Sequence, residues 1–392
     1  MGILCLVAVF AQSALHLIRP VTSYKILELD GSATTIGLTT AVYALLPVVV
    51  APSVGRLSDR TAWLWRWMVL GVGTMALGSA LLTIAPGMTW VMVGSALLGV
   101  GHLMLTVCLQ AVIARRALQG RLAAGFGWFT AANSVGQMVG PFLGGWLVEA
   151  GPAWVGDSRG AIDLALAGGL LFAVLTVPII LVARRDFTVP VKAPGSQSGG
   201  EQGPETTWSL IRRPKVGVVL YCSLGFVALV DILAAFMPLI GEERGIPPLV
   251  IGAILAVRGG ASFASRAVLP WLTARYSDQK LLIVSLLGSA LCFAVMPFVV
   301  ELMWLATVLA AAGGFALGIG QPVTMAMIST AVPFESRGQA LALRLVSSRF
   351  GQVVIPLGAG SLAGAFGPVA AVQLAVFVLL SATAVSGKLN RP

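Results

Sequence analysis

Long apolar runs, separated by short polar or Gly/Pro-rich segments, alternate along the whole chain. Most runs span about 20 residues or more, the length that an α-helix needs to cross the hydrocarbon core of a bilayer. The pattern predicts helices over residues 3–27, 34–54, 65–84, 88–112, 122–149, 160–183, 215–240, 248–272, 280–299, 302–329, 338–364 and 367–387. The predicted fold is therefore an all-α membrane protein with twelve transmembrane helices.

One polar segment divides these helices into six and six. Residues 185–212 are rich in Gly, Ser, Pro and charge, as is typical of a flexible, solvated linker. The expected organisation is a first bundle in residues 1–184, a cytoplasmic linker in 185–212 and a second bundle in 213–392.

An internal repeat relates the two predicted bundles. At an offset of 215 residues the matches are Gly37 with Gly252, Leu57 with Leu272, Arg60 with Arg275, Gly99 with Gly314, Gly136-Gln137 with Gly351-Gln352, Pro141 with Pro356 and Gly145 with Gly360. Chance glycine matches are easy in a chain with 46 glycines, but the shared G-Q-x-x-x-P-x-x-x-G block is much harder to match by chance. The repeat predicts two pseudo-symmetric bundles with a substrate site between them near the bilayer midplane.

Composition and charge exclude a soluble enzyme. The chain is 57% hydrophobic and 10% charged, whereas soluble domains carry about a quarter charged residues. The net charge of +10 comes mainly from Lys and Arg on the linker side, since only Lys25, Arg159 and Arg244 fall in the opposite loops. By the positive-inside rule, the linker and both termini are expected in the cytoplasm, and the charge requires no nucleic-acid partner. We expect a monomer surrounded by lipid in a bacterial inner membrane.

No cofactor, metal site or catalytic residue is predicted. Cys5, Cys108, Cys222 and Cys292 lie in apolar runs without paired spacing, as packing residues do. There is no nucleotide-binding motif, so an ion gradient or the gradient of the substrate must supply the energy. The N-terminal segment has no basic region or small-residue cleavage site, and we interpret it as the first span.

Between the second and third predicted helices the sequence reads GRLSDR. Gly55, Leu57, Asp59 and Arg60 resemble the G-x-L-a-D-r signature of the major facilitator superfamily, although residues 62–64 replace its trailing G-r-k. We expect Gly55 to allow a tight turn and Asp59 to cap a helix or pair with arginine. The resemblance implies a conformational latch formed by Gly55, Asp59 and Arg60; the alternative is a simple helix cap.

The fifth predicted helix carries a string of small residues, Gly136, Gly140, Pro141, Gly144 and Gly145. Glycines four apart allow close helix packing, and the proline bends the helix. The string G-x-x-x-G-P-x-x-G-G resembles the signature of drug and metabolite exporters in the same superfamily, which implies efflux by an antiporter. These exporters usually also carry an arginine on the fourth helix that is tied to proton coupling, and here that position is Ser95. The departure puts the familiar route of proton antiport in doubt.

Charges inside membrane spans are costly and commonly functional. Asp231 and Arg258 each lie about 14 to 15 Å from the outer ends of their helices, so we expect them to form an ion pair. At the repeat offset His16 aligns with Asp231 and Tyr43 with Arg258. The full set of candidate substrate or coupling residues is Asp231, Arg258, His16, Arg19, Tyr43 and Arg349.

Other deep polar residues have plainer interpretations. His102 is expected to be a hydrogen-bonded core residue, and Arg266 and Arg344 to extend toward the cytoplasmic surface. The surplus of deep arginines over Asp231 favours anionic or zwitterionic organic substrates, with protons as a candidate coupling ion.

Three alternatives to an exporter remain at this point. An importer of organic anions has the same fold, a lipid-modifying enzyme would need a polar catalytic cluster, and a sensor would normally bring a soluble signalling domain.

Overall fold

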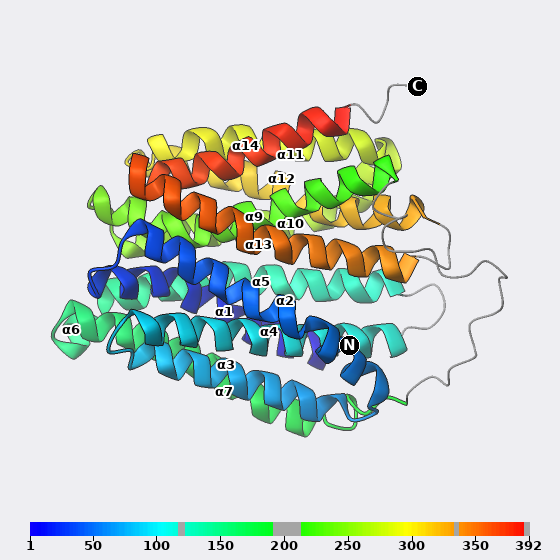
Figure 1. Cartoon of the computed structure of the whole chain (residues 1–392), viewed down its shortest axis with the longest axis horizontal. Helices are drawn as coiled ribbons and strands as arrows, with labels where there is room; N and C mark the ends of the chain where they lie inside the picture. Colours follow the sequence, from blue (N-terminus) through cyan, green and yellow to red (C-terminus); the bar gives the residue numbers. More distant parts are fainter. Residues whose placement is uncertain (117–121, 191–212, 333–336, 388–392) are drawn as a thin grey trace.

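A computed structural model describes residues 1–116, 122–190, 213–332 and 337–387. Twelve long helices and one short helix, α6, lie nearly parallel in two side-by-side groups (Figure 1). The long helices are α1 (Gly2–Glu28), α2 (Ala33–Arg60), α3 (Leu64–Thr83), α4 (Met88–Arg116), α5 (Leu122–Ala150), α7 (Ser158–Val182), α9 (Pro214–Glu243), α10 (Pro248–Arg275), α11 (Asp278–Val295), α12 (Met303–Thr330), α13 (Arg337–Phe366) and α14 (Pro368–Gly387). The short α6 (Pro152–Val155) and a 3-10 turn (Met296–Phe298) complete the described structure.

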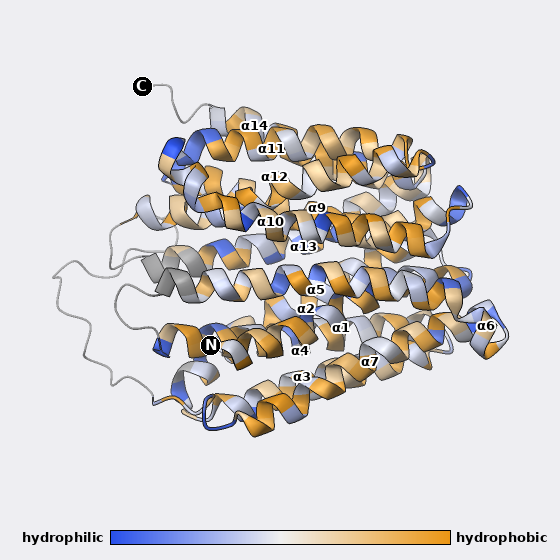
Figure 2. Cartoon of the chain, turned by 180° about the vertical axis from the view of Figure 1, so that it is seen from behind, coloured by the Kyte–Doolittle hydropathy of each residue, from blue (hydrophilic) through white to orange (hydrophobic). Residues whose placement is uncertain are grey.

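The predicted helices match the observed ones closely because apolar runs and their boundaries are local signals. Within the described residues, ten helices are long and apolar enough to span a membrane by length and composition. Side chains cap three of the helix starts: Ser32 and Asp157 accept from the backbone N–H of Thr35 and Gly160, and Ser277 accepts from Lys280. Apolar residues cover the helix sides and polar ones gather at the two ends (Figure 2).

The two ends of the bundle are distinct. We call the end where α1 begins, α7 ends and α9 begins the linker end, and the opposite end the α6 end (Figure 1). Helices α1–α7 form the first half and α9–α14 the second half. The halves meet where α2 packs on α13, α5 on α10, and α1 on α9.

Glycine backbones close the α6 end of this interface. Gly37 of α2 packs on Gly360 of α13, and a Cβ atom at Gly37 would meet the backbone of Gly360 at 2.6 Å. Gly145 of α5 packs on Gly252 of α10, where the Cβ–Cα distance would be 3.1 Å. A Cβ at Gly145 would also meet Pro248 O at an even shorter distance, so neither contact, which we call a glycine seam, leaves room for a side chain.

The start of the expected linker is anchored by two buried side chains, although its other residues are exposed. Phe187 and Val189 are buried, and Val189 donates its backbone N–H to Ala62 O at 2.9 Å. Thr188 and Trp63 form an isolated antiparallel bridge. Residues 185–190 therefore pack against the first half, because two apolar side chains in this polar stretch find a buried position there; the rest of the linker lies outside the described residues.

Candidate substrate and coupling site

An ion pair joins the two halves at the centre of the bundle. Arg19 of α1 donates from Nη1 to Oδ1 of Asp231 on α9, and the two side chains are 9% and 4% exposed. Counted along their helices, they lie about 14 and 18 Å from the α6 end. The pair thus sits near mid-depth, where a charge without a partner is costly.

The second carboxylate oxygen extends this contact to a third helix. Gln352 of α13 donates from Nε2 to Asp231 Oδ2 at 2.6 Å. The same amide accepts at Oε1 from Arg349 Nη1 at 3.1 Å. We call Arg19, Asp231, Gln352 and Arg349 the central relay; it carries two positive charges and one negative charge.

A second network lies in the first half. His102 of α4 contacts Gln12 Nε2 through Nε2 at 3.1 Å and Tyr43 Oη through Nδ1 at 2.8 Å. An amide nitrogen only donates, so Nε2 of His102 accepts and the neutral ring carries its proton on Nδ1, which donates to Tyr43. The guanidinium of Arg19 lies 4.6 Å from the centre of the Tyr43 ring, so a cation–π contact connects this network to the central relay.

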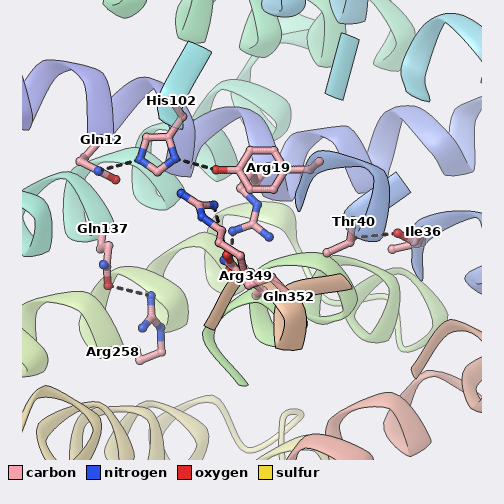
Figure 3. A network of polar contacts seen from close by, with 11 residues as sticks. Gln12, Arg19, Ile36, Thr40, His102, Gln137, Arg258, Arg349 and Gln352 are labelled. Atoms are coloured by element: carbon pink, nitrogen blue, oxygen red, sulfur yellow. Dashed lines mark hydrogen bonds and ion pairs between the residues drawn. The ribbon is translucent and has the colours of Figure 1, made fainter. Parts of the chain in front are cut away.

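The predicted pair of Asp231 with Arg258 is wrong. Arg258 Nη2 instead donates to Gln137 Oε1 on α5 at 3.5 Å, and its Nε has no hydrogen-bond partner in the described protein. Equal depth along two helices does not fix the direction in which each side chain points, and both oxygens of Asp231 are occupied by Arg19 and Gln352. Figure 3 shows Arg258 and Gln137 apart from the group that contains Arg19, Arg349 and Gln352.

The other predicted residues divide between the network and the core. Tyr43, Arg19 and Arg349 lie in the connected networks. His16 is 6% exposed, and its backbone packs under Gly140; within the described chain its imidazole forms no hydrogen bond.

The expectation that Arg266 and Arg344 extend toward the surface is also wrong. Arg266 reaches across to α5, where it donates to Thr130 O and, at 2.5 Å, to Ser134 Oγ. Arg344 is 8% exposed and donates to Thr324 Oγ1 at 3.3 Å. Acceptors on neighbouring helices bind one terminal nitrogen of each guanidinium group, whereas both buried Nε atoms have no hydrogen-bond partner in the described protein.

Sequence reasoning missed two glutamines that hold the buried charges. Gln137 and Gln352 are equivalent at the repeat offset, and each contacts an arginine, Arg258 and Arg349 respectively. The matched Gly-Gln pairs are the available signal, but a repeat match does not reveal which side chain a glutamine contacts. Gln12 had no comparable signal, because a single glutamine in an apolar run does not reveal its partner.

The exporter-like string on α5 packs against both halves. Gly136, Gly140 and Gly144 lie against α1, where added Cβ atoms would meet residues 12–21. Gly145 faces Gly252 of the second half, and Pro141 contributes the carbonyl that a Cβ at Gly252 would meet. This helix therefore sets how closely α10 approaches the first half.

The segment of the expected latch is helical. Helix α2 continues through Gly55 to Arg60, so the tight turn predicted at Gly55 is wrong; a Cβ there would meet nothing within 4 Å. Arg115 of α4 binds the end of α2 by donating to Ser58 O and, at 2.8 Å, to Thr61 O, which satisfies carbonyls that a helix end leaves free. The side chain of Asp59 lies outside the described part of the chain.

A small cavity adjoins Arg19 on the side toward the α6 end. Its volume is about 20 Å3, and it is lined by Arg19, by hydroxyl-bearing residues of α1, α2 and α4, and by the apolar residues Ile26, Ile36, Leu98 and Ala235. Such a volume holds about one water-sized species, so an organic substrate does not fit there in this conformation. Ser95, which stands where the exporters usually have arginine, is part of this lining.

Comparisons with known proteins agree over nearly the whole chain. The family model described as Major Facilitator Superfamily matches residues 4–310 and 229–389. The multi-drug resistance efflux pump PmrA homolog of Lactococcus lactis subsp. lactis (strain IL1403) is 24% identical over 364 residues, covering 91% of this chain and 86% of that protein. Multidrug resistance protein 1 of Bacillus subtilis (strain 168) is 27% identical over 227 residues, 56% of this chain and 54% of that protein.

Solved structures share the fold at low sequence identity. A bacterial homolog of the human lysosomal transporter Spinster superposes with a TM-score of 0.75 at 16% identity, covering 98% of this chain and 95% of that one. A POT family transporter gives a TM-score of 0.78 at 12% identity, covering 100% and 96%.

Proposed function

Because the chain belongs to the Major Facilitator Superfamily, and is therefore a multi-pass membrane transporter and not an enzyme, we propose that it exports small organic anions or zwitterions by alternating access. Residues 1–184 and 213–392 would rock as two bodies about the central relay, joined by residues 185–212. Membership of a transporter family excludes the alternative of a lipid-modifying enzyme.

The observation that carries the proposal is the surplus of buried positive charge. Arg19, Arg258 and Arg349 lie near mid-depth, and in the described residues Asp231 is the one acid at that depth. A low-dielectric site with this balance attracts a negatively charged group and disfavours a lipophilic cation. The substrate carboxylate, phosphate or sulfonate would compete with Asp231 for Arg19 and thereby loosen the contact between the halves.

The proposed direction of transport and the proposed orientation in the membrane rest on the sequence and on the relatives of the chain. The two curated relatives are named as multidrug efflux or resistance proteins, and the α5 string resembles that of exporters. The linker end carries most of the arginines, so it would face the cytoplasm. The glycine seams would then close the outer side, giving the state in which substrate enters from inside.

The transport proposal is tested by counterflow in oriented proteoliposomes. Radiolabelled organic anions and zwitterions are compared with matched lipophilic cations, after a disrupted strain has been screened for metabolites that accumulate inside. We expect saturable exchange of anions or zwitterions by the wild-type chain and loss of that exchange in Asp231→Asn. Exchange of lipophilic cations alone would refute the substrate class.

The orientation is tested separately by cysteine labelling in intact cells. Thr330 lies exposed at the linker end and Ser158 lies exposed at the α6 end. In a background lacking the native cysteines, a membrane-impermeant maleimide should label Ser158→Cys at once and Thr330→Cys only after permeabilisation. The reverse pattern would invert the topology and place the linker outside.

An importer of organic anions is the second candidate, because the same positive charge surplus would serve inward transport equally. Measurements of initial rates with an imposed substrate gradient in each direction distinguish the two. Net uptake that depends on an inward ion gradient, without efflux, would support the importer.

A further inference from the structure

The cavity beside Arg19 presents hydrogen-bond donors without partners. Nη2 of Arg19 and Oγ1 of Thr39 are buried atoms that form no hydrogen bond in the described protein, and both residues line the cavity. The Arg19 side chain is 9% exposed and Thr39 is 3% exposed. Two unpartnered buried polar groups in one small cavity indicate a site for a ligand that accepts hydrogen bonds.

The hydrogen bonds of the other hydroxyl groups in the lining show which groups are free to bind a ligand. Thr22, Ser23 and Thr40 donate to backbone oxygens of Ile18, Ala235 and Ile36, so their protons are committed elsewhere. Ser95, which is 4% exposed, lines the cavity without such a bond. Tyr43 also lines the cavity, but its hydroxyl already contacts His102 Nδ1 at 2.8 Å. The groups without any partner that are left to meet a ligand are therefore Nη2 of Arg19 and the hydroxyls of Thr39 and Ser95.

Charge and size select the class of ligand. The cavity lining contains one charged group, Arg19, and no carboxylate. The central relay and Arg258 together carry more positive than negative charge, so an anion here would offset part of the cost of burying them. The volume of about 20 Å3 excludes an organic carboxylate and admits a single-atom anion.

We propose that this cavity is a site for a monatomic halide, chloride in the cell, held by Arg19, Thr39 and Ser95 while the α6 end is closed. The anion neutralises the face of Arg19 that Asp231 does not reach. Halide binding thus stabilises the closed conformation, independently of the substrate and of the direction of transport.

The test measures thermal unfolding of the purified full chain in detergent at constant ionic strength. Sodium chloride or bromide replaces sodium gluconate, whose anion is too large for the cavity. At ten times the dissociation constant we expect the halides to raise the Tm by about 2 °C, in a saturable manner, for a chain of this length. Because this readout involves no transport, its failure is distinct from failure of the proposed function.

Two variants form a matched pair. Thr39→Val removes an unpartnered hydroxyl and should abolish the halide effect on Tm. Thr40→Val removes a neighbouring hydroxyl of the same lining whose proton is already donated to Ile36 O, and should retain the effect. A halide effect that persists unchanged in Thr39→Val would place the anion elsewhere and overturn the proposal.

A crystal grown in bromide decides the matter if Thr39→Val does not fold. An anomalous peak within hydrogen-bond distance of Arg19 Nη2 and Thr39 Oγ1 is expected for the wild-type chain. No anomalous peak at this position, together with a Tm that is the same in chloride, bromide and gluconate, would show that the site holds water instead.

Discussion

Replacement of Asp231 by Asn tests the contact between the two halves. The change removes the one acid at mid-depth among the described residues and leaves Arg19 and Arg349 beside each other without a counter-charge. The new amide can still accept from Gln352, so the loss is mainly electrostatic. The pair joins α1 to α9, so its loss should destabilise the contact between halves more than the packing within either half.

The magnitude follows from burial and distance. Two unit charges about 4 Å apart interact by about 4 kcal/mol at an effective dielectric constant of 20. Both side chains are more than nine-tenths buried, so screening by water is small. Breaking a buried pair by removal of one partner costs about 3 to 5 kcal/mol, and we expect Asp231→Asn to fall in that range.

A double-mutant cycle identifies the partner. The free energy of unfolding is measured in mixed micelles for Asp231→Asn, Arg19→Gln and the double variant. We expect the double variant to be more stable than Asp231→Asn, with a coupling energy of about 2 to 3 kcal/mol. The matched control combines Asp231→Asn with Arg258→Gln, because Arg258 lies at similar depth but contacts Gln137.

Two results would refute this reasoning. A coupling energy with Arg258 as large as that with Arg19 would restore the pairing inferred from depth alone. A coupling energy near zero for both arginines would show that Asp231 is compensated by groups other than the two cations, and that the relay does not join the halves energetically.

The remaining predictions concern closure, the histidine network and the latch. Gly252→Val should disfavour closure of the α6 end, because its Cβ would meet Pro141 O, and should therefore raise labelling of cysteines placed near Arg19. Gly73→Val is the control, since a Cβ at Gly73 would meet nothing within 4 Å. Equal labelling of the two variants would contradict the role of the glycine seam. Tyr43→Phe keeps the ring over Arg19 but removes the partner of His102 Nδ1, so the free energy of unfolding should fall by about 1 to 3 kcal/mol, and no change would argue against this hydrogen bond. Asp59→Asn should slow transport more than it lowers folded yield, since a latch biases a conformational equilibrium; equal losses in the two measurements would make Asp59 an ordinary structural residue.

The helices and their pairing into halves were predictable because their signals are one-dimensional. Apolar run length sets each helix, and the repeat offset relates Gly37 to Gly252 and Gly145 to Gly360. The depth of a charge along a helix is likewise computed from residue number. These quantities require no knowledge of how one helix is rotated against another.

The hydrogen-bond partners within the site were not predictable, because they depend on how each helix is rotated about its axis. Depth placed Asp231 level with Arg258, but rotation of the helices directs Asp231 toward Arg19 and Gln352. The short turn expected at Gly55 failed because a glycine without steric demand continues a helix as readily as it ends one when the neighbouring residues favour the helix. Contacts between distant helices depend on packing that sequence spacing does not encode.

The two glycine seams have a geometric consequence for how the halves can move. The repeat carries Gly37 onto Gly252 and Gly360 onto Gly145, so the Gly37–Gly360 and Gly145–Gly252 contacts are copies of one another about a pseudo-two-fold axis. Because the two equivalent contacts lie on opposite sides of this axis, opening only one of them would tilt one half against the other. Opening both together moves the halves apart symmetrically. A bulky residue in one seam would therefore skew the halves as well as part them, whereas the same residue in both would part them evenly.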